Sequence, residues 1–181
     1  MSAVFNYDYA ILGVNPDTEE DMNQINQIIH HPTYLAHVAR ITEWEKDREF
    51  CRHNTSHFLD VARIAMILNI QENYGMQQKL IYAAALLHDI GRWQQYESGV
   101  DHALASANLA PEILKDCGFS ETEKEQIVSA IATHRESRVK EEKNLNGLLY
   151  RADKLSRPCF FCEQEKNCNW KDDKKNKDLV L

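Results

Sequence analysis

A helix that is apolar on nearly every face lies near the middle of this sequence and ends in two polar residues. From Gln77 to His88, leucine, isoleucine and alanine recur on all sides of a helical projection, and Asp89 and Gly91 follow. A helix of this kind is buried among other elements. Burying an imidazole beside a carboxylate is costly unless something compensates for the lost hydration, and a metal ion does so. The segment therefore predicts a central helix with a metal site at its end.

Helical spacing of apolar residues recurs elsewhere, whereas the strict alternation that marks a half-buried strand is hard to find. The sequence contains only six glycines and four prolines, and Ser120-x-x-Glu123 forms a capping box. We therefore expect an all-α protein, a compact multi-helix bundle. One helix is expected directly after a capping sequence at residues 17–21. The other expected helices cover residues 32–44, 50–70, 77–88, 101–109, 111–118, 120–132 and 144–156.

Length and composition favour one soluble domain. The 181 residues are 43% hydrophobic and 27% charged, which suits a single core. The net charge of −7 argues against binding to polymeric nucleic acid or anionic membranes. No apolar run approaches the roughly 18–20 residues of a membrane span, and residues 1–8 lack the features of a signal peptide. We expect a cytoplasmic protein with no membrane partner, and the sequence leaves a homodimer open.

Three of the five cysteines cluster as Cys159-x2-Cys162-x5-Cys168. In a reducing compartment such residues are thiols or metal ligands before they are disulfides. A structural zinc site normally has four ligands, and no fourth is evident because Cys51 and Cys117 are remote in the sequence. We therefore expect free thiols, with a redox or zinc-scaffold role as the weaker alternative.

Side chains that can bind metals fall within or beside several of the apolar helices. Inward-facing donors from different helices of a bundle can converge on one centre. Two histidines and two aspartates would hold one ion, and two further histidines would let Asp89 bridge two. Imidazole and carboxylate donors suit one or two divalent ions of iron, manganese, zinc or cobalt, and magnesium is a further candidate. The candidate ligands are His57, His88, Asp89, His102, His134 and Asp153.

This set resembles the signature of the HD-domain superfamily of metal-dependent phosphohydrolases, with His57, His88-Asp89 and Asp153 in matching order. His102 and His134 resemble the extra histidines of members with two metals. The resemblance covers about residues 48–158 and implies a bundle of at least five helices around the metal. We therefore expect one HD-like domain over residues 1–181, with a polar, cysteine-containing extension at 159–181 that the superfamily does not generally share. That extension suggests a small stand-alone bacterial member. Its last stretch, 171–181, is expected to be solvated or frayed.

An acidic protein that binds phosphate needs local cations, and we expect Arg48, Arg92 and Lys154 to bind the substrate. His53 lies four residues before His57 and is a candidate for protonating the leaving group, while Asp89 orients the nucleophile. The resemblance implies cleavage of a phosphate ester or anhydride of a nucleotide or other small phosphorylated metabolite through a metal-activated water.

Two alternatives remain at this level. A minority of the superfamily uses two irons to activate dioxygen, so a di-iron oxygenase on the same scaffold would share these ligands. A non-catalytic module that senses a nucleotide is the other, although a complete ligand set argues against a site that has lost its activity.

Overall fold

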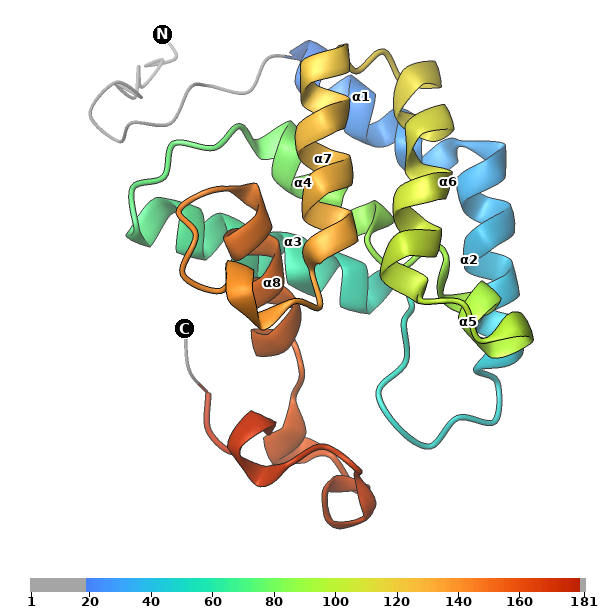
Figure 1. Cartoon of the computed structure of the whole chain (residues 1–181), viewed down its shortest axis with the longest axis vertical. Helices are drawn as coiled ribbons and strands as arrows, with labels where there is room; N and C mark the ends of the chain where they lie inside the picture. Colours follow the sequence, from blue (N-terminus) through green and yellow to red (C-terminus); the bar gives the residue numbers. More distant parts are fainter. Residues whose placement is uncertain (1–18, 180–181) are drawn as a thin grey trace, which may run out of the picture.

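The computed structural model describes residues 19–179, and within that range the chain is helical with no strand (Figure 1). This confirms the predicted all-α class. The α-helices are α1 (Glu19–His30), α2 (Pro32–Trp44), α3 (Thr55–Gln71), α4 (Gln78–Leu87), α5 (Arg92–Ser98), α6 (His102–Asp116), α7 (Glu121–Thr133) and α8 (Leu145–Leu155). Four short 3-10 helices follow α7 or α8: η2 (Ser137–Val139), η3 (Cys159–Phe161), η4 (Glu165–Asn167) and η5 (Asp172–Lys174).

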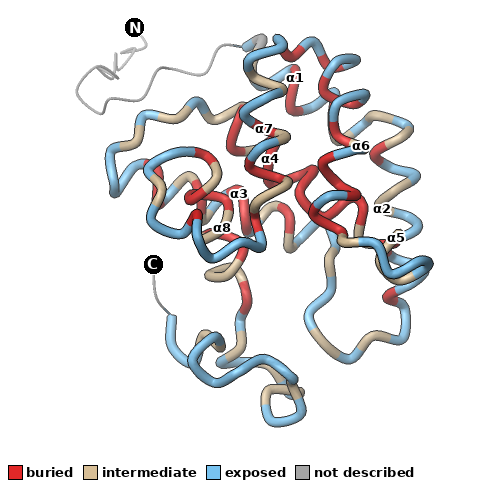
Figure 2. Tube along the Cα trace, viewed as in Figure 1, coloured by how far each residue is buried: buried red, intermediate tan, exposed pale blue. Residues whose placement is uncertain are grey.

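Helix α4 is the centre of the bundle, as its sequence predicts. It packs against α1, α3, α7 and α8, and most of its trace has the colour of buried residues (Figure 2). From Leu80 to Leu87 every residue except Tyr82 is buried. Ala83, Ala84 and Ala85 are fully buried, and their small side chains let neighbouring backbones approach from several directions. The last turn of α4 therefore ends deep inside the protein. No helix among residues 19–179 is long and apolar enough to cross a membrane.

Helix α6 corrects one expectation, because Pro111 lies inside it and does not separate two helices. A proline within a helix removes one backbone hydrogen bond and costs about 3 kcal/mol. Here Ala110, Ile113 and Leu114 are fully buried on the core side, and each large apolar side chain contributes about 1.5–3 kcal/mol on burial. Packing therefore outweighs the lost hydrogen bond.

Two other helix boundaries differ from the predictions. Helix α3 begins at Thr55 and not near residue 50, because the Asn54 side chain accepts the His57 backbone N–H at 3.0 Å and caps the helix. Helix α5 was not predicted, since seven residues are too few to show a clear apolar period. In the capping sequence predicted at 17–21, Asp17 and Thr18 lie outside the described residues.

The C-terminal segment is more ordered than its charge predicts. Lys175 Nζ lies 2.8 Å from the Glu165 carbonyl oxygen and 3.1 Å from its carboxylate. The Asn176 amide donates to the carbonyl oxygens of Lys154 and Arg157, at 2.9 and 2.8 Å. Residues 171–174 and 177–179 are exposed, which confirms the expected solvated tail, whereas the contacts of Lys175 and Asn176 show that it is not frayed as far as residue 176.

Gly91 sets the distance between the end of α4 and helix α6. Its N–H donates to Ser106 Oγ at 2.9 Å, and a Cβ on Gly91 would lie 2.4 Å from Ser106 N and 2.7 Å from the Ala105 carbonyl carbon. These neighbours are backbone atoms, which cannot rotate away. Only glycine allows α6 to come this close.

We expect Gly91→Ala to lower the free energy of unfolding by about 2 kcal/mol or more, the scale of overpacking in a core. Chemical denaturation of the purified variant measures this. Gly99→Ala is the matched control, because nothing lies within 4 Å of its added Cβ and only its positive φ of 77° opposes the substitution, at about 1 kcal/mol. Equal losses in the two variants would contradict the close-approach explanation.

Candidate metal centre

Two of the candidate histidines lie directly after a helix and are oriented by its last turn. His88 follows α4, and its Nδ1 lies 2.7 Å from the Ala85 carbonyl oxygen. His134 follows α7, and its Nδ1 lies 2.7 Å from the Ile131 carbonyl oxygen. The last carbonyls of a helix lack intrahelical partners, and a carbonyl oxygen only accepts, so Nδ1 carries the proton in both rings. In the neutral ring each Nε2 is therefore unprotonated and can bind a metal, and it is turned into the interior.

His57 lies in the first turn of α3. Its Nδ1 is also held by an acceptor, in this case the hydroxyl of Ser156, which directly follows α8. The Ser156 hydroxyl donates its proton to the Asp153 carbonyl oxygen at 2.8 Å and lies 3.3 Å from His57 Nδ1. Because the hydroxyl proton is used, Ser156 accepts from Nδ1–H and leaves His57 Nε2 free to bind a cation. Hydrogen bonds from metal-binding histidines to such acceptors are a general means of fixing ring orientation.

His102 opens α6, which is capped by Asp101: its carboxylate accepts the N–H groups of Ala103 and Leu104 at 2.9 and 3.3 Å. The same carboxylate pairs with Arg135, two residues after α7, at 2.5 Å. This ion pair links the start of α6 to the segment that follows α7. His102 Nδ1 lies 2.6 Å from Gln95 Oε1. Burial lowers the pKa of His102 to about 3, which keeps the ring neutral.

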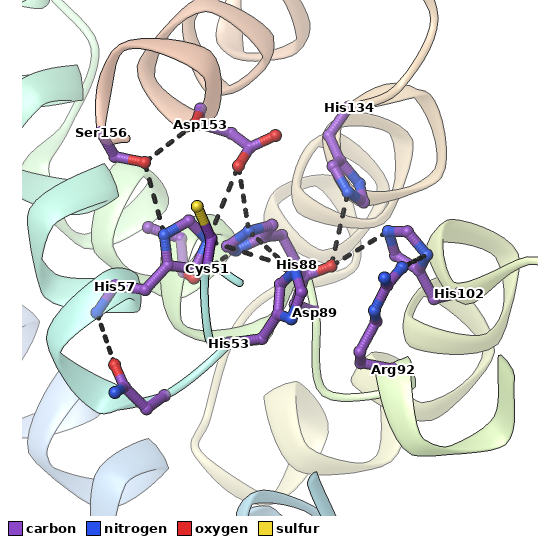
Figure 3. A network of polar contacts seen from close by, with 12 residues as sticks. Cys51, His53, His57, His88, Asp89, Arg92, His102, His134, Asp153 and Ser156 are labelled. Atoms are coloured by element: carbon purple, nitrogen blue, oxygen red, sulfur yellow. Dashed lines mark hydrogen bonds and ion pairs between the residues drawn. The ribbon is translucent and has the colours of Figure 1, made fainter. Parts of the chain in front are cut away.

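The carboxylate of Asp89 lies between two groups of imidazole nitrogens (Figure 3). Its Oδ2 is 3.1 Å from His88 Nε2 and 3.7 Å from His57 Nε2. Its Oδ1 is 3.2 Å from His102 Nε2 and 3.6 Å from His134 Nε2. The two oxygens thus face different histidine pairs, the arrangement that a bridging carboxylate requires.

Asp153 on α8 lies beside the histidine pair His57 and His88. Its Oδ1 lies 3.6 Å from His57 Nε2 and 3.9 Å from His88 Nε2. The ligand atoms of His57, His88 and Asp153 all lie within 4.8 Å of one another, and so do those of His88, Asp89 and His134. The structure therefore brings all six candidate ligands together.

Unpartnered buried atoms show that these residues fit a metal ion. In the described part of the chain, His57 Nε2, His88 Nε2 and Asp89 Oδ1 are buried without a hydrogen-bond partner. An unprotonated imidazole nitrogen facing a carboxylate oxygen sets two acceptors against each other, and such buried groups are costly unless compensated. A divalent cation between them satisfies both. Nitrogen and oxygen donors without sulfur are the set that iron, manganese, zinc and cobalt accept.

The pKa directions agree with this view. Burial by itself would raise the pKa of Asp89, but the charges of His88 and His53 hold it well below its usual value. Burial also opposes ionisation of Asp153, and the neighbouring Lys154 ammonium reverses this and lowers its pKa. Burial disfavours protonated His88, yet Asp89 and Asp153 raise its pKa. Both carboxylates are ionised at neutral pH, and metal binding would displace any proton held by His88.

His53 lies beside the ligands and is held by a residue that the sequence did not single out. Its Nδ1 is 2.5 Å from Glu45 Oε1 and its backbone N–H donates to Glu45 Oε2 at 2.7 Å. Tyr96 donates to the same carboxylate at 2.6 Å. His53 Nε2 faces Asp89 Oδ2 at 3.9 Å. Burial opposes the charge of Glu45, but the bonds from His53 and Tyr96 lower its pKa, so a buried carboxylate orients His53.

A family comparison now bears on this geometry. A model of the HD domain matches residues 54–157, which is more than half of the chain and includes all six candidate ligands. The chain belongs to the HD-domain family. The helices whose ends carry the six side chains are thus the shared core, whereas Glu45, His53 and the cysteine-containing extension lie outside the matched region.

Similar proteins extend this comparison. An uncharacterized protein of Clostridium beijerinckii is 44% identical over 155 residues, which cover 86% of this HD protein and 97% of the relative. Ribonuclease Y of Lawsonia intracellularis is 29% identical over 150 residues, 83% of this chain but 23% of that longer protein. A crystal structure of a predicted HD superfamily hydrolase from an uncultured Thermotogales bacterium has a TM-score of 0.59 and 24% identity, covering 81% of this chain and 82% of that one. That structure supports the fold.

Sequence reasoning missed Glu45, Gln95 and Ser156, the residues that orient the candidate ligands and His53. Each is an ordinary polar residue in the sequence, and its role depends on which helices pack together. Glu45 is 3% exposed, but it lies in a run of charged residues that predicts a solvated surface.

We expect the wild-type protein to bind about two Mn²⁺ ions per chain, as a carboxylate-bridged pair requires. His134→Ala should bind about one, and Asp89→Ala none. Equilibrium dialysis with Mn²⁺, which prefers oxygen and nitrogen to sulfur, measures the stoichiometry. Asp60→Ala is the control, because Asp60 is an exposed residue of α3 that faces Arg63. Retention of both ions by Asp89→Ala would show that Asp89 does not bridge them.

Proposed function

We propose that this protein is a metal-dependent phosphohydrolase that cleaves a phosphate ester or anhydride of a nucleotide or other small phosphorylated metabolite. The observation that carries the proposal is the charge of the cavity above the candidate metal centre. The cavity has a volume of about 430 Å³, within the range of small-molecule sites. Among the described residues that line it, eight are arginines or lysines and two, Asp89 and Asp153, are acids. Such walls in a chain of net charge −7 favour an anionic substrate.

The three predicted substrate-binding cations, Arg48, Arg92 and Lys154, line this cavity. Each has a different hydrogen-bond or ion-pair partner. Arg48 Nε donates to the Cys51 carbonyl oxygen at 2.8 Å, which leaves the rest of its guanidinium to bind phosphate. Lys154 is paired with Asp153, so it faces both the centre and the cavity. The Arg92 guanidinium donates to Gln95 Oε1 at 2.7 Å, the same oxygen that lies 2.6 Å from His102 Nδ1. Arg92 therefore holds Gln95, which positions His102, and adds positive charge to the wall.

The six ligands would hold two divalent ions, which lower the pKa of a bound water and stabilise negative charge at phosphorus. Asp89 would help to hold these ions, because its two oxygens face different pairs of histidines. A substrate phosphate would be bound by the arginine and lysine side chains of the cavity, bidentately in the case of arginine.

His53 is the residue that we propose to protonate the leaving oxygen. Its Nδ1 is held by Glu45, so its Nε2 faces the cavity. General acid catalysis needs such a fixed group beside the reacting atoms. Glu45 does not line the cavity itself and acts by positioning His53.

We expect Mn²⁺-dependent hydrolysis of at least one member of a panel of nucleotides, dinucleoside polyphosphates, phosphomonoesters and short RNA. Short RNA is included because of the similarity to ribonuclease Y. Asp89→Ala should lose at least 10³-fold in kcat/KM, the scale of removing the charge stabilisation at a reaction centre, and Asp60→Ala should match the wild type. Phosphate release measures both. Dioxygen consumption without phosphate release would favour the di-iron oxygenase, and nucleotide binding without turnover would favour a sensing module.

We expect Glu45→Gln to lower kcat about tenfold or more while KM changes little, because loss of an outer orienting carboxylate costs about 10–100-fold. The control is Glu43→Gln, which alters an exposed residue of α2 paired with Lys46. Steady-state kinetics separates kcat from KM. A rise in KM alone would assign Glu45 to substrate binding and not to the orientation of His53.

A further inference from the structure

The extension after α8 is ordered although it has no core of its own. Between residues 158 and 179 no residue is buried, and its three short 3-10 helices are joined by turns. Hydrogen bonds of Lys175 and Asn176 hold part of this segment, and structures without a core are commonly stabilised further by metal sites or disulfides. The extension is the part of the chain that carries Cys159, Cys162 and Cys168.

Successive turns of three residues separate these cysteines, one turn between Cys159 and Cys162 and two between Cys162 and Cys168. Cys162 N–H donates to the Cys159 carbonyl at 3.1 Å, Glu165 N–H to the Cys162 carbonyl at 3.1 Å, and Cys168 N–H to the Glu165 carbonyl at 3.4 Å. In 3-10 geometry the side chains of residues i and i+3 eclipse one another. The backbone thus places Cys159 and Cys162 on one side of the chain, in the arrangement of a C-x2-C metal-binding turn.

The fourth cysteine comes from the loop between α2 and α3. In that loop, Phe50 and Arg52 line one cavity together with Cys162 and Gln164. Cys51, between them, lines the cavity of the metal centre together with residues of the extension that include Arg157 and Trp170. The loop is therefore packed against the extension on both sides of Cys51.

The charges around Cys51 agree with this packing. Burial raises the pKa of the Cys51 thiol, and the Cys159, Cys162 and Cys168 thiols raise it further. A cation would reverse the effect, because thiolates are stabilised by a bound metal. No three of these four Sγ atoms lie within 4.8 Å of one another in the described part of the chain, so binding a metal would draw the loop and the extension closer together.

We propose that Cys51, Cys159, Cys162 and Cys168 form a second metal centre, a four-thiolate site that takes a zinc ion or an iron–sulfur cluster. Four cysteines are a complete ligand set for either group, and thiolates select these groups over the ions that suit imidazole and carboxylate. The remaining cysteine, Cys117, is buried at the end of α6 and takes no part.

This site would join two walls of the cavity above the first centre. The loop supplies Arg48 and Arg52, and the extension supplies Trp170, Lys171 and Lys174. Arg157 stacks over Trp170, with its guanidinium carbon 4.0 Å from the ring centroid. The thiolate centre therefore fixes the positions of the cations that face the substrate. That consequence rests on the proposed function, whereas metal binding by the cysteines does not.

The test measures zinc, iron and acid-labile sulfide in full-length Asp89→Ala protein that is expressed and purified without oxygen. In this variant the first centre is disrupted. We expect about one zinc ion per chain, or about four iron and four sulfide ions for a cubane cluster. The sulfide content and visible absorption distinguish zinc from a cluster. Absence of both groups would overturn the proposal.

Two substitutions at opposite ends of the proposed site make the test specific. Adding Cys51→Ser or Cys162→Ser should each remove the same metal, although the two residues lie in remote segments. The matched control, Cys117→Ala, should retain it. Limited proteolysis should then cut residues 158–179 in the serine variants while the helices keep their circular dichroism. Retention of the metal by Cys51→Ser, or a disulfide among the four cysteines found by thiol labelling of the oxygen-free protein, would contradict the proposal.

Discussion

The carboxylate of Asp89 is the group on which the rest of the structure depends. It is 3% exposed, and burial of an ionised carboxylate costs several kcal/mol unless partners compensate. Its two oxygens face separate pairs of imidazoles, His57 and His88 on one side and His102 and His134 on the other. In the neutral rings of His57 and His88 only Nδ1 carries a proton, so each Nε2 and the carboxylate are both acceptors, and a cation between them satisfies both. A bound metal ion would therefore stabilise this arrangement.

These side chains come together because most of them lie at the ends of helices that meet at Asp89. The hydrogen bonds that complete α4 and α7, from His88 to Ala85 and from His134 to Ile131, also turn each Nε2 towards Asp89. Gly91 then lets α6 approach the end of α4 closely enough for His102 to join them. Folding and ligand orientation therefore use the same contacts, so a substitution that shifts a helix end should also weaken metal binding.

The sequence predicts the parts of this protein that depend on local pattern. Helical periodicity identifies the buried α4, and the unusual pair His88-Asp89 with four further donors identifies the centre. Pro111 led to the wrong prediction of a helix boundary, because the packing of α6 against the core outweighs the tendency of proline to end a helix. Glu45 could not be found, since its burial depends on how α2 and α5 pack. Cys51 was likewise set aside for its distance in sequence from Cys159, although the loop that carries it shares cavities with the extension.

The central claim is that Asp89 bridges two ions, and anomalous diffraction from crystals equilibrated with Mn²⁺ tests it most directly. The account predicts two anomalous peaks about 3.5–4 Å apart, one beside each oxygen of Asp89. The first peak should lie among His57, His88 and Asp153, and the second beside His102 and His134. A single peak that contacts only one oxygen of Asp89, or peaks remote from this carboxylate, would contradict it.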